Sequence, residues 1–279
     1  MSSPTTLPLA ASGATVMDVA RRCAREGGAI ALTAFRGDRT ITFKGRGNVV
    51  TDADFASERR IHEVIREEFP EHAILSEETA STTDPHHGWV WVVDPIDGTK
   101  NYAMGVPFWC VTVALCCDGE PVVGVTYDAV HDETFHAERG GGAFLDGAPI
   151  APSARDDVES SIIGVDLGYD EARGSAQIAL IGRIFPRVQA VRILGSAALA
   201  IAYAACGRLD LFTHLNLAPW DLAAGMLLVR ESGGAITDRA GAPAVITSSG
   251  VVAGGCRVHA DFVARYGSRR GDAPDVASG

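Results

Sequence analysis

Two carboxylates stand close together in one short segment that follows a strand-like run of valine and tryptophan. In WVVDPIDGTKN, Asp94 and Asp97 lie on either side of Pro95. Proline has a fixed φ, and Gly98 can adopt backbone conformations closed to other residues, so a tight turn can hold both acids on one side. Such carboxylates repel each other unless a cation joins them. For an isolated DPIDG, an ordinary turn would be favoured by about two to one, because Asp, Pro and Gly are common in turns.

Two further acidic segments accompany this one. Glu77 and Glu78 close the run AILSEE upstream, and a Glu pair at a strand end is more often solvated than functional. In PWDLAAG, Asp221 precedes a run of small residues, and on its own it is typical of a helix N-cap that accepts backbone N–H bonds. An N-cap role is compatible with metal binding. The three segments become informative when they occur together in this order.

The combination resembles the inositol monophosphatase family, whose acidic metal motifs have the forms DPIDGT and WDxAAG. Residues 94–99 and 220–225 match these motifs residue for residue. The resemblance runs from about Lys44 to about Gly255 and includes VTDAD, RILGSAAL and GRLDLF. It implies a Mg²⁺-dependent phosphomonoesterase that acts on a small phosphorylated metabolite, first of all inositol monophosphate. It also implies lithium sensitivity and a homodimer.

The resemblance implies a metal site of hard oxygen ligands, which Mg²⁺ prefers, with two or three ions in each active site. The implied ligands of one ion are Glu77, Asp94, Thr99 and the backbone carbonyl of Ile96, and those of a second are Asp94, Asp97 and Asp221. Two cations about 3.5–4 Å apart can clamp a phosphate, stabilise the leaving alkoxide and lower the pKa of a bound water. They would also supply positive charge to a chain whose net charge is -11.

The other site roles also come from the resemblance. Asp54, with the hydroxyl of Thr99, would position and deprotonate the attacking water, with Asp52 as the alternative, and Glu77 would take part in catalysis as well as bind metal. Water would attack directly, without a phosphoenzyme. Lys44 would belong to a mobile loop over the site. The implied contacts to phosphate and substrate are Asp97, the backbone N–H groups of Gly98 and Thr99 at a helix start, His214 and Asp221.

His214 departs from the family pattern. Many members that cleave inositol phosphates carry an acid seven residues before the Asp of the WD pair, where this chain has His214 in THLNLAPWD. Fructose 1,6-bisphosphate, histidinol phosphate and a 3′-phosphoadenosine nucleotide therefore remain alternative substrates. A non-enzymatic family member that binds a ligand or a partner is a further alternative, although the metal-ligand set is complete.

The hydrophobic pattern predicts the elements that must position these residues. Residues 16–35 have helical spacing interrupted by Gly27 and Gly28, which predicts a helix that is kinked or broken there. A second helix is predicted from residues 52–54 to Phe69, with Pro70 closing it. Short β-type runs precede Glu77 and Asp94. Residues 108–145 predict an antiparallel meander, and helices and strands alternate after Pro149.

The resemblance implies an α+β and α/β fold, a layered αβαβα sandwich of the inositol monophosphatase and fructose-1,6-bisphosphatase type. We expect an N-terminal α+β half at 1–149 with the DPIDGT motif, a C-terminal α/β half at 150–268 with the WDLAAG motif, and a flexible tail at 269–279.

Composition bounds the class of protein. With 47% hydrophobic and 21% charged residues, the 279-residue chain is typical of soluble globular proteins. Its negative charge disfavours partners such as nucleic acid or an anionic membrane. The six cysteines lack metal-ligand spacing and indicate core thiols in a reducing compartment. The amino end has no basic stretch before its apolar run, and the longest uncharged run is too short to span a bilayer. We expect a cytoplasmic protein whose partner is a small phosphate ester.

Overall fold

The computed structural model describes residues 6–37, 40–45, 48–79 and 83–268. Its helices are α1 (Val16–Phe35), α2 (Asp52–Glu68), α3 (Thr99–Met104), α4 (Glu171–Ile184), the 3₁₀ helix η1 (Phe185–Arg187), α5 (Ala197–Ala205), α6 (Pro219–Glu231) and α7 (Cys256–Tyr266). Its strands are β1 (Ile41–Gly45), β2 (Asn48–Thr51), β3 (Ala73–Ser76), β4 (Trp89–Asp97), β5 (Cys110–Cys117), β6 (Glu120–Asp128), β7 (Glu133–Glu138), β8 (Gly142–Leu145), β9 (Ala148–Pro149), β10 (Ile162–Val165), β11 (Ala190–Ile193), β12 (Leu211–His214), β13 (Ala235–Thr237) and β14 (Val251–Gly254).

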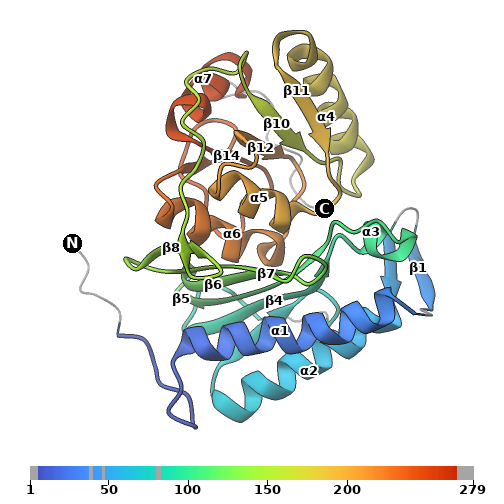
Figure 1. Ribbon diagram of the computed structural model, residues 1–279, viewed down its shortest axis with the longest axis vertical. Helices are drawn as coiled ribbons and strands as arrows, with labels where there is room; N and C mark the ends of the chain where they lie inside the picture. The colour runs from blue at the N-terminus through green and yellow to red at the C-terminus, as the bar shows by residue number, and fades with distance from the viewer. Residues whose placement is uncertain (1–5, 38–39, 46–47, 80–82, 269–279) are drawn as a thin grey trace.

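Helices and sheets alternate in layers (Figure 1). α1 and α2 cover one face of a seven-stranded sheet of order β3-β4-β5-β6-β7-β8-β9. α5 and α6 lie between this sheet and a five-stranded sheet of order β11-β10-β12-β14-β13. The remaining face of the second sheet is covered by α4 and α7. This order confirms the αβαβα sandwich that the family resemblance implied.

The first sheet is buried on both faces, which explains why β4 reads as a continuous apolar run. β3 pairs parallel to β4, and the strands from β4 to β9 pair antiparallel in sequence order. The predicted meander is therefore confirmed. Trp91 and Val93 of β4 face the α1–α2 layer, while Val90 and Val92 join a second apolar cluster with residues of α6. Side chains alternate across the two faces, as the period of a strand requires.

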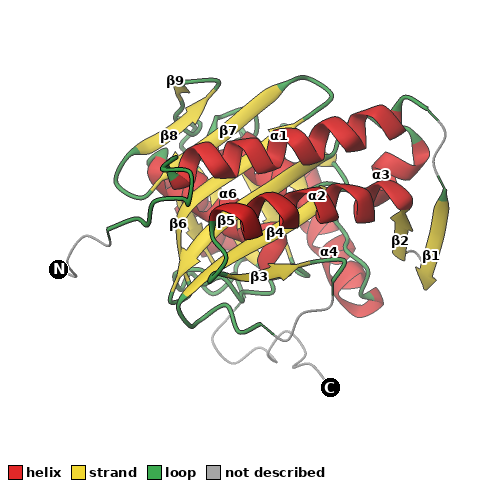
Figure 2. Ribbon diagram, turned by 90° about the horizontal axis from the view of Figure 1, so that it is seen from below, coloured by secondary structure: helices red, strands yellow, loops and turns green. Residues whose placement is uncertain are grey.

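α1 and α2 lie across the outer face of this sheet (Figure 2). α1 runs unbroken through Gly27 and Gly28, so the predicted break is wrong. A Cβ on Gly27 would come within 2.8 Å of Ile61 Cδ1 on α2, and a Cβ on Gly28 within 2.6 Å of the Tyr127 ring on β6. The two glycines allow close packing of the helix instead of interrupting it. The predicted second helix is confirmed as α2.

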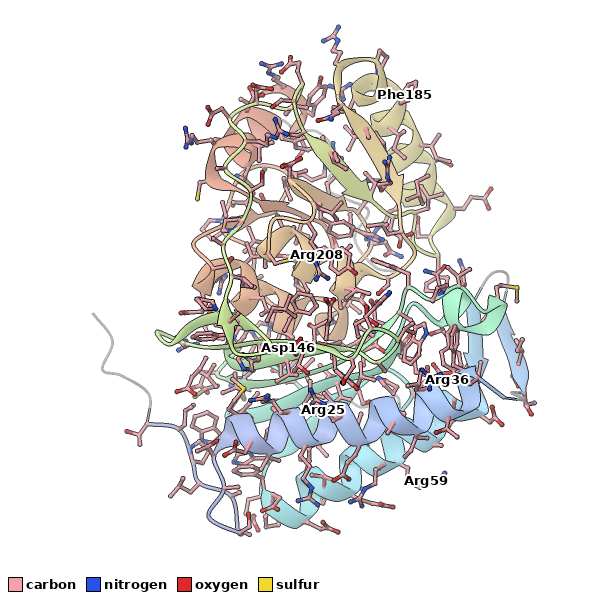
Figure 3. All side chains as sticks on the ribbon, in the orientation of Figure 1. Arg25, Arg36, Arg59, Asp146, Phe185 and Arg208 are labelled. Carbon is pink, nitrogen blue, oxygen red and sulfur yellow. The ribbon has the colours of Figure 1, made fainter. Side chains whose placement is uncertain are left out.

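Two arginines join elements that are far apart in the sequence (Figure 3). Arg25 of α1 pairs with Asp132 at 3.2 Å and donates to the Thr134 hydroxyl of β7 at 2.9 Å. Arg208, which follows α5, makes a bidentate pair with Glu133 of β7 at 2.5 Å. Bidentate Arg–carboxylate geometry is directional, so the pair orients the α5 layer on the first sheet.

The second half of the chain builds the second sheet. β10 pairs parallel with β11 and β12, whereas β14 pairs antiparallel with β12 and β13. The first sheet ends at Pro149 and the second begins at Ile162. We propose the boundary near residue 150 as the division between the two halves. The predicted tail at 269–279 lies outside the described residues.

Within the described residues, no helix is both long and apolar enough to cross a membrane. All six cysteines are free thiols, and Cys23, Cys110 and Cys116 are buried.

The packing of α6 on the first sheet gives a test of the fold. A Cβ on Gly124 of β6 would lie 2.9 Å from the Cα of Ala224 on α6, so backbone must move to admit it. We expect Gly124→Ala to lower the free energy of unfolding by about 1–3 kcal/mol through overpacking. The matched control is Gly182→Ala on α4, where a Cβ meets no atom within 4 Å. This control should gain up to about 1 kcal/mol from helix propensity. Urea unfolding measures the free energy of unfolding of both variants. Equal values for Gly124→Ala and Gly182→Ala would contradict the close packing of α6 on β6.

Candidate active site

The DPIDG segment forms the end of β4 and an irregular turn into α3. The pairing of β4 with β5 shifts register between Asp94 and Asp97. Asp94 Oδ1 accepts the N–H of Ile96 at 3.0 Å, which folds its carboxylate over the turn. Gly98 has a φ of 94°, and a Cβ there would lie 3.0 Å from the carbonyl oxygen of Gly195. Only glycine meets both requirements. The turn therefore holds two buried carboxylates against the second half of the chain.

Asp97 joins the two halves at the start of α5. Its carboxylate accepts the Ser196 hydroxyl and the N–H groups of Ala197 at 3.3 Å and Ala198 at 3.0 Å. Burial raises the pKa of Asp97 to about 6, although these hydrogen bonds favour the charged form. An acid at the first turn of a helix is also stabilised by the helix dipole. Ser196 lies in the RILGSAAL motif, but no pattern in that motif predicts its contact with Asp97.

Asp221 lies in the first turn of α6. Its Oδ2 accepts the N–H of Ala218 at 2.7 Å. Ala218 is the N-cap and Asp221 the third helical residue, so the predicted N-cap position is wrong. The reason is that Pro219 starts the helix earlier, at a position where its missing N–H costs nothing. The expected backbone N–H bond to Asp221 is nevertheless present.

These three acids converge in one cavity. Carboxylate oxygens of Asp94, Asp97 and Asp221 lie within 4.8 Å of one another, the one such group among the described residues. Glu77 lines the same cavity, which has a volume of about 360 Å³, but it is outside the 4.8 Å group. The cavity lining also includes Gly98 and Thr99.

The electrostatics of the cluster favour a bound cation. Burial, followed by repulsion from neighbouring acids, raises the pKa of Glu77 to about 8 and that of Asp94 well above its usual range. The same two causes raise the pKa of Asp221 to about 8. Buried like charges that cannot all ionise are stabilised by protons or by a metal ion. An all-oxygen donor set of this kind fits Mg²⁺ and disfavours soft metals.

Asp54 and Thr99 meet beside the carboxylate cluster. The Thr99 hydroxyl donates to the Ile96 carbonyl at 3.0 Å and lies 3.4 Å from Asp54 Oδ1. Thr51 holds the other oxygen of Asp54 through its N–H at 2.8 Å and its hydroxyl. Burial raises the pKa of Asp54 to about 7. Asp52, the alternative base, is exposed and accepts the N–H of Thr40.

His214 ends β12 and lines the same cavity with a side chain only 3% exposed. Its Nδ1 accepts the N–H of Asn216 at 2.8 Å, which assigns the ring proton to Nε2. Burial lowers the pKa of His214 to about 4, so the ring is neutral at pH 7. The histidine thus offers a hydrogen-bond donor where many family members offer a carboxylate.

Sequence reasoning missed several residues of the cavity wall. Asp166 follows β10 and lines the cavity, and the rule that strands can end in functional acids would have found it. The Nζ of Lys100 lies 4.2 Å from the centre of the Tyr169 ring. This cation–π contact connects α3 with the loop after β10. Burial, followed by the nearby carboxylates, raises the pKa of Tyr169 above its usual range. The side chain of Lys44, on β1, is outside the described part of the chain.

Comparison with known proteins places this site in a family. The profile described as the inositol monophosphatase family matches residues 13–270. Inositol monophosphatase 2 of Solanum lycopersicum is 36% identical over 254 residues, which cover 88% of this chain and 96% of that protein. Nus factor SuhB of Escherichia coli strain K12 is 34% identical over 261 residues, 92% of this chain and 98% of that protein.

A solved structure agrees with these matches. The crystal structure of extragenic suppressor protein suhB from Bartonella henselae superposes with a TM-score of 0.84 and 32% identity, covering 91% of this chain and 99% of that one. The fold and the acidic motifs are thus accounted for together: the chain belongs to the inositol monophosphatase family of phosphatases.

Proposed function

We propose that the protein is a Mg²⁺-dependent phosphomonoesterase that hydrolyses a small phosphorylated metabolite, with inositol monophosphate as the first substrate. The observation that carries this proposal is the convergence of Asp94, Asp97 and Asp221 in a cavity that Glu77 and Thr99 also line. A phosphate ester is an anion, and this cavity is strongly acidic without a cation. Metal binding is the arrangement that reconciles the two.

Different residues of the chain would bind the metal ions and the phosphate. Glu77, Asp94, the Ile96 carbonyl and Thr99 would hold one metal ion, and Asp94, Asp97 and Asp221 a second. When bound, the ions supply positive charge for the phosphate and the leaving oxygen, and two or three of them are expected. Backbone N–H groups of Gly98 and Thr99 orient the phosphate.

Asp54 would accept the proton of the attacking water, which the Thr99 hydroxyl helps to place. Its buried carboxylate has a pKa of about 7, near the value that suits a general base at neutral pH. The 3.4 Å separation from the Thr99 hydroxyl leaves the two groups close enough to contact one water molecule.

The relatives named inositol monophosphatase support an inositol phosphate substrate. The neutral His214 keeps fructose 1,6-bisphosphate, histidinol phosphate and 3′-phosphoadenosine nucleotides as alternatives. The name Nus factor, carried by the Escherichia coli relative, supports partner binding as an added function. A homodimer, lithium sensitivity, a cytoplasmic location and the absence of nucleic-acid or membrane partners stay predictions.

Phosphate release from these four substrate classes, with Mg²⁺ and with EDTA, tests the proposal. We expect Mg²⁺-dependent release from at least one of them, with inositol monophosphate preferred. The absence of release from every substrate would favour the non-catalytic alternative.

Replacing Asp94 by Asn keeps an oxygen for the Ile96 N–H but removes the charge. We expect phosphate release to fall by about 100-fold or more, because a ligand shared by two ions is lost. The metal-free protein should melt at a higher temperature, since Asn removes a buried acid whose ionisation is opposed by burial and by neighbouring acids. Asp128→Asn is the control, because Asp128 is equally buried, accepts the N–H of Val130, and does not line the cavity. Full turnover by Asp94→Asn would contradict the metal assignment.

The stabilisation that Mg²⁺ confers should increase with pH. In the metal-free fold the raised pKa values of Glu77 and Asp221 mean that protonation stabilises the protein, fully below about pH 4, and this stabilisation is lost as pH rises through about 8. Because Mg²⁺ must displace these protons, it binds more tightly at pH 8 than at pH 5.

Melting temperatures with Mg²⁺ and with EDTA at both pH values measure this difference, and buried histidines outside the cavity, such as His62 and His259, affect both measurements alike. At pH 8 we expect Mg²⁺ at about 100 times its Kd to add about 2.7 kcal/mol. An equal gain at pH 5 would contradict the linkage.

A further inference from the structure

Glu58 is a buried carboxylate of α2 that has no part in the reaction proposed above. It is 4% exposed. It accepts the hydroxyls of Ser76 and Thr79 and the N–H groups of Glu78 and Thr79, each N–H at 3.1 Å. All four donors belong to residues 76–79, the segment that carries Glu77 into the cavity. One carboxylate, with two oxygens and about four acceptor positions, therefore accepts all four of these donors.

The same segment is tied to the first sheet on its other side. The N–H of Glu77 donates to the carbonyl of Val93 at 3.3 Å, which continues the parallel pairing of β3 with β4. Val93 is the residue before Asp94. The position of Glu77 relative to Asp94 is thus set by β4 on one side and by α2 on the other.

α2 also sets the position of Glu77 relative to Asp54. Asp54 and Glu58 are four residues apart, so their side chains lie one turn apart on the same face of the helix. One face of α2 therefore carries the proposed base, Asp54, and also Glu58, which holds the segment that contains Glu77.

Repulsion between the cavity carboxylates is the reason why the segment that carries Glu77 needs an anchor. Glu77 lines the same cavity as Asp94, Asp97 and Asp221, so their like charges act against keeping the Glu77 carboxylate there before a metal ion binds. Hydrogen bonds from residues 76, 78 and 79 to a carboxylate oppose this displacement, because leaving would strand several donors.

We propose that Glu58 is a positioning residue, which holds residues 76–79 so that the Glu77 carboxylate faces Asp94 and Asp221. This inference rests on the metal site of the proposed function. In this proposal, Glu58 on α2 does not contact the metal. It holds in place a metal ligand, Glu77, that belongs to the segment after β3.

The test compares three variants of the full chain. Glu58→Ala removes all acceptors, and Glu58→Gln is the conservative replacement that keeps one acceptor oxygen. Glu68→Ala is the matched control, because Glu68 is also a buried acid of α2 and accepts the N–H of Ser12 and Arg22 Nη1, far along the helix from residues 76–79. Calorimetry measures Mg²⁺ affinity, hydrogen exchange measures protection of the Glu78 and Thr79 amides, and phosphate release is followed against Mg²⁺ concentration.

We expect Glu58→Ala to weaken Mg²⁺ binding by about tenfold or more and to accelerate exchange of the Glu78 and Thr79 amides. Its kcat should recover at saturating Mg²⁺, because the anchor acts on metal affinity and not on the chemical step. Glu58→Gln should fall between Glu58→Ala and the wild type. Glu68→Ala should keep wild-type Mg²⁺ affinity while its melting temperature falls.

Unchanged Mg²⁺ affinity and amide exchange in folded Glu58→Ala would overturn the inference, and so would equal weakening in Glu68→Ala, which would reveal a general loss of stability. If Glu58→Ala does not fold, Glu58→Gln and Thr79→Val carry the same comparison. A wild-type protein that neither binds Mg²⁺ nor releases phosphate would instead refute the proposed function, so the two failures are distinguishable.

Discussion

Mutual repulsion among buried carboxylates is the constraint on which this structure depends. Glu77, Asp94, Asp97 and Asp221 share one cavity, and burial and their neighbours raise the pKa of each. Holding such groups together without a cation costs free energy, because each has lost water and gained a like charge. Burial of the apolar layers of the sandwich must offset this cost, and a bound metal ion would lower it by reducing the repulsion.

Backbone donors are the means by which the fold keeps these acids in place. Asp94 accepts the N–H of Ile96, Asp221 that of Ala218, and Asp97 those at the start of α5. Glu77 is held through its chain segment, which Glu58 anchors by accepting the N–H groups of Glu78 and Thr79. Each carboxylate is therefore fixed through rigid elements before any ligand arrives, which is the condition for a precise metal site.

The two halves of the chain contribute different parts of the cavity. β4 and α2 carry Asp94, Asp97 and Asp54, which we propose hold the metal and activate the water. The second half adds Asp221 of α6 and the wall formed by Asp166 and the neutral His214. The proposed metal ligands therefore come from both halves, whereas the wall at Asp166 and His214 comes from the second half alone, so this wall can change between relatives without altering the metal ligands.

Local sequence determined the helices, the meander and the turn at Asp94 to Gly98, because periodicity and the φ preferences of proline and glycine act over a few residues. The motif resemblance named Glu77, Asp94, Asp97 and Asp221 of the cavity but not Asp166. The tertiary structure alone decided that Gly27 and Gly28 pack a continuous α1, that Asp97 holds the start of α5, and that Glu58 anchors residues 76–79. These contacts join segments far apart in the sequence, and a pattern reports which face a residue occupies but not which partner meets it there.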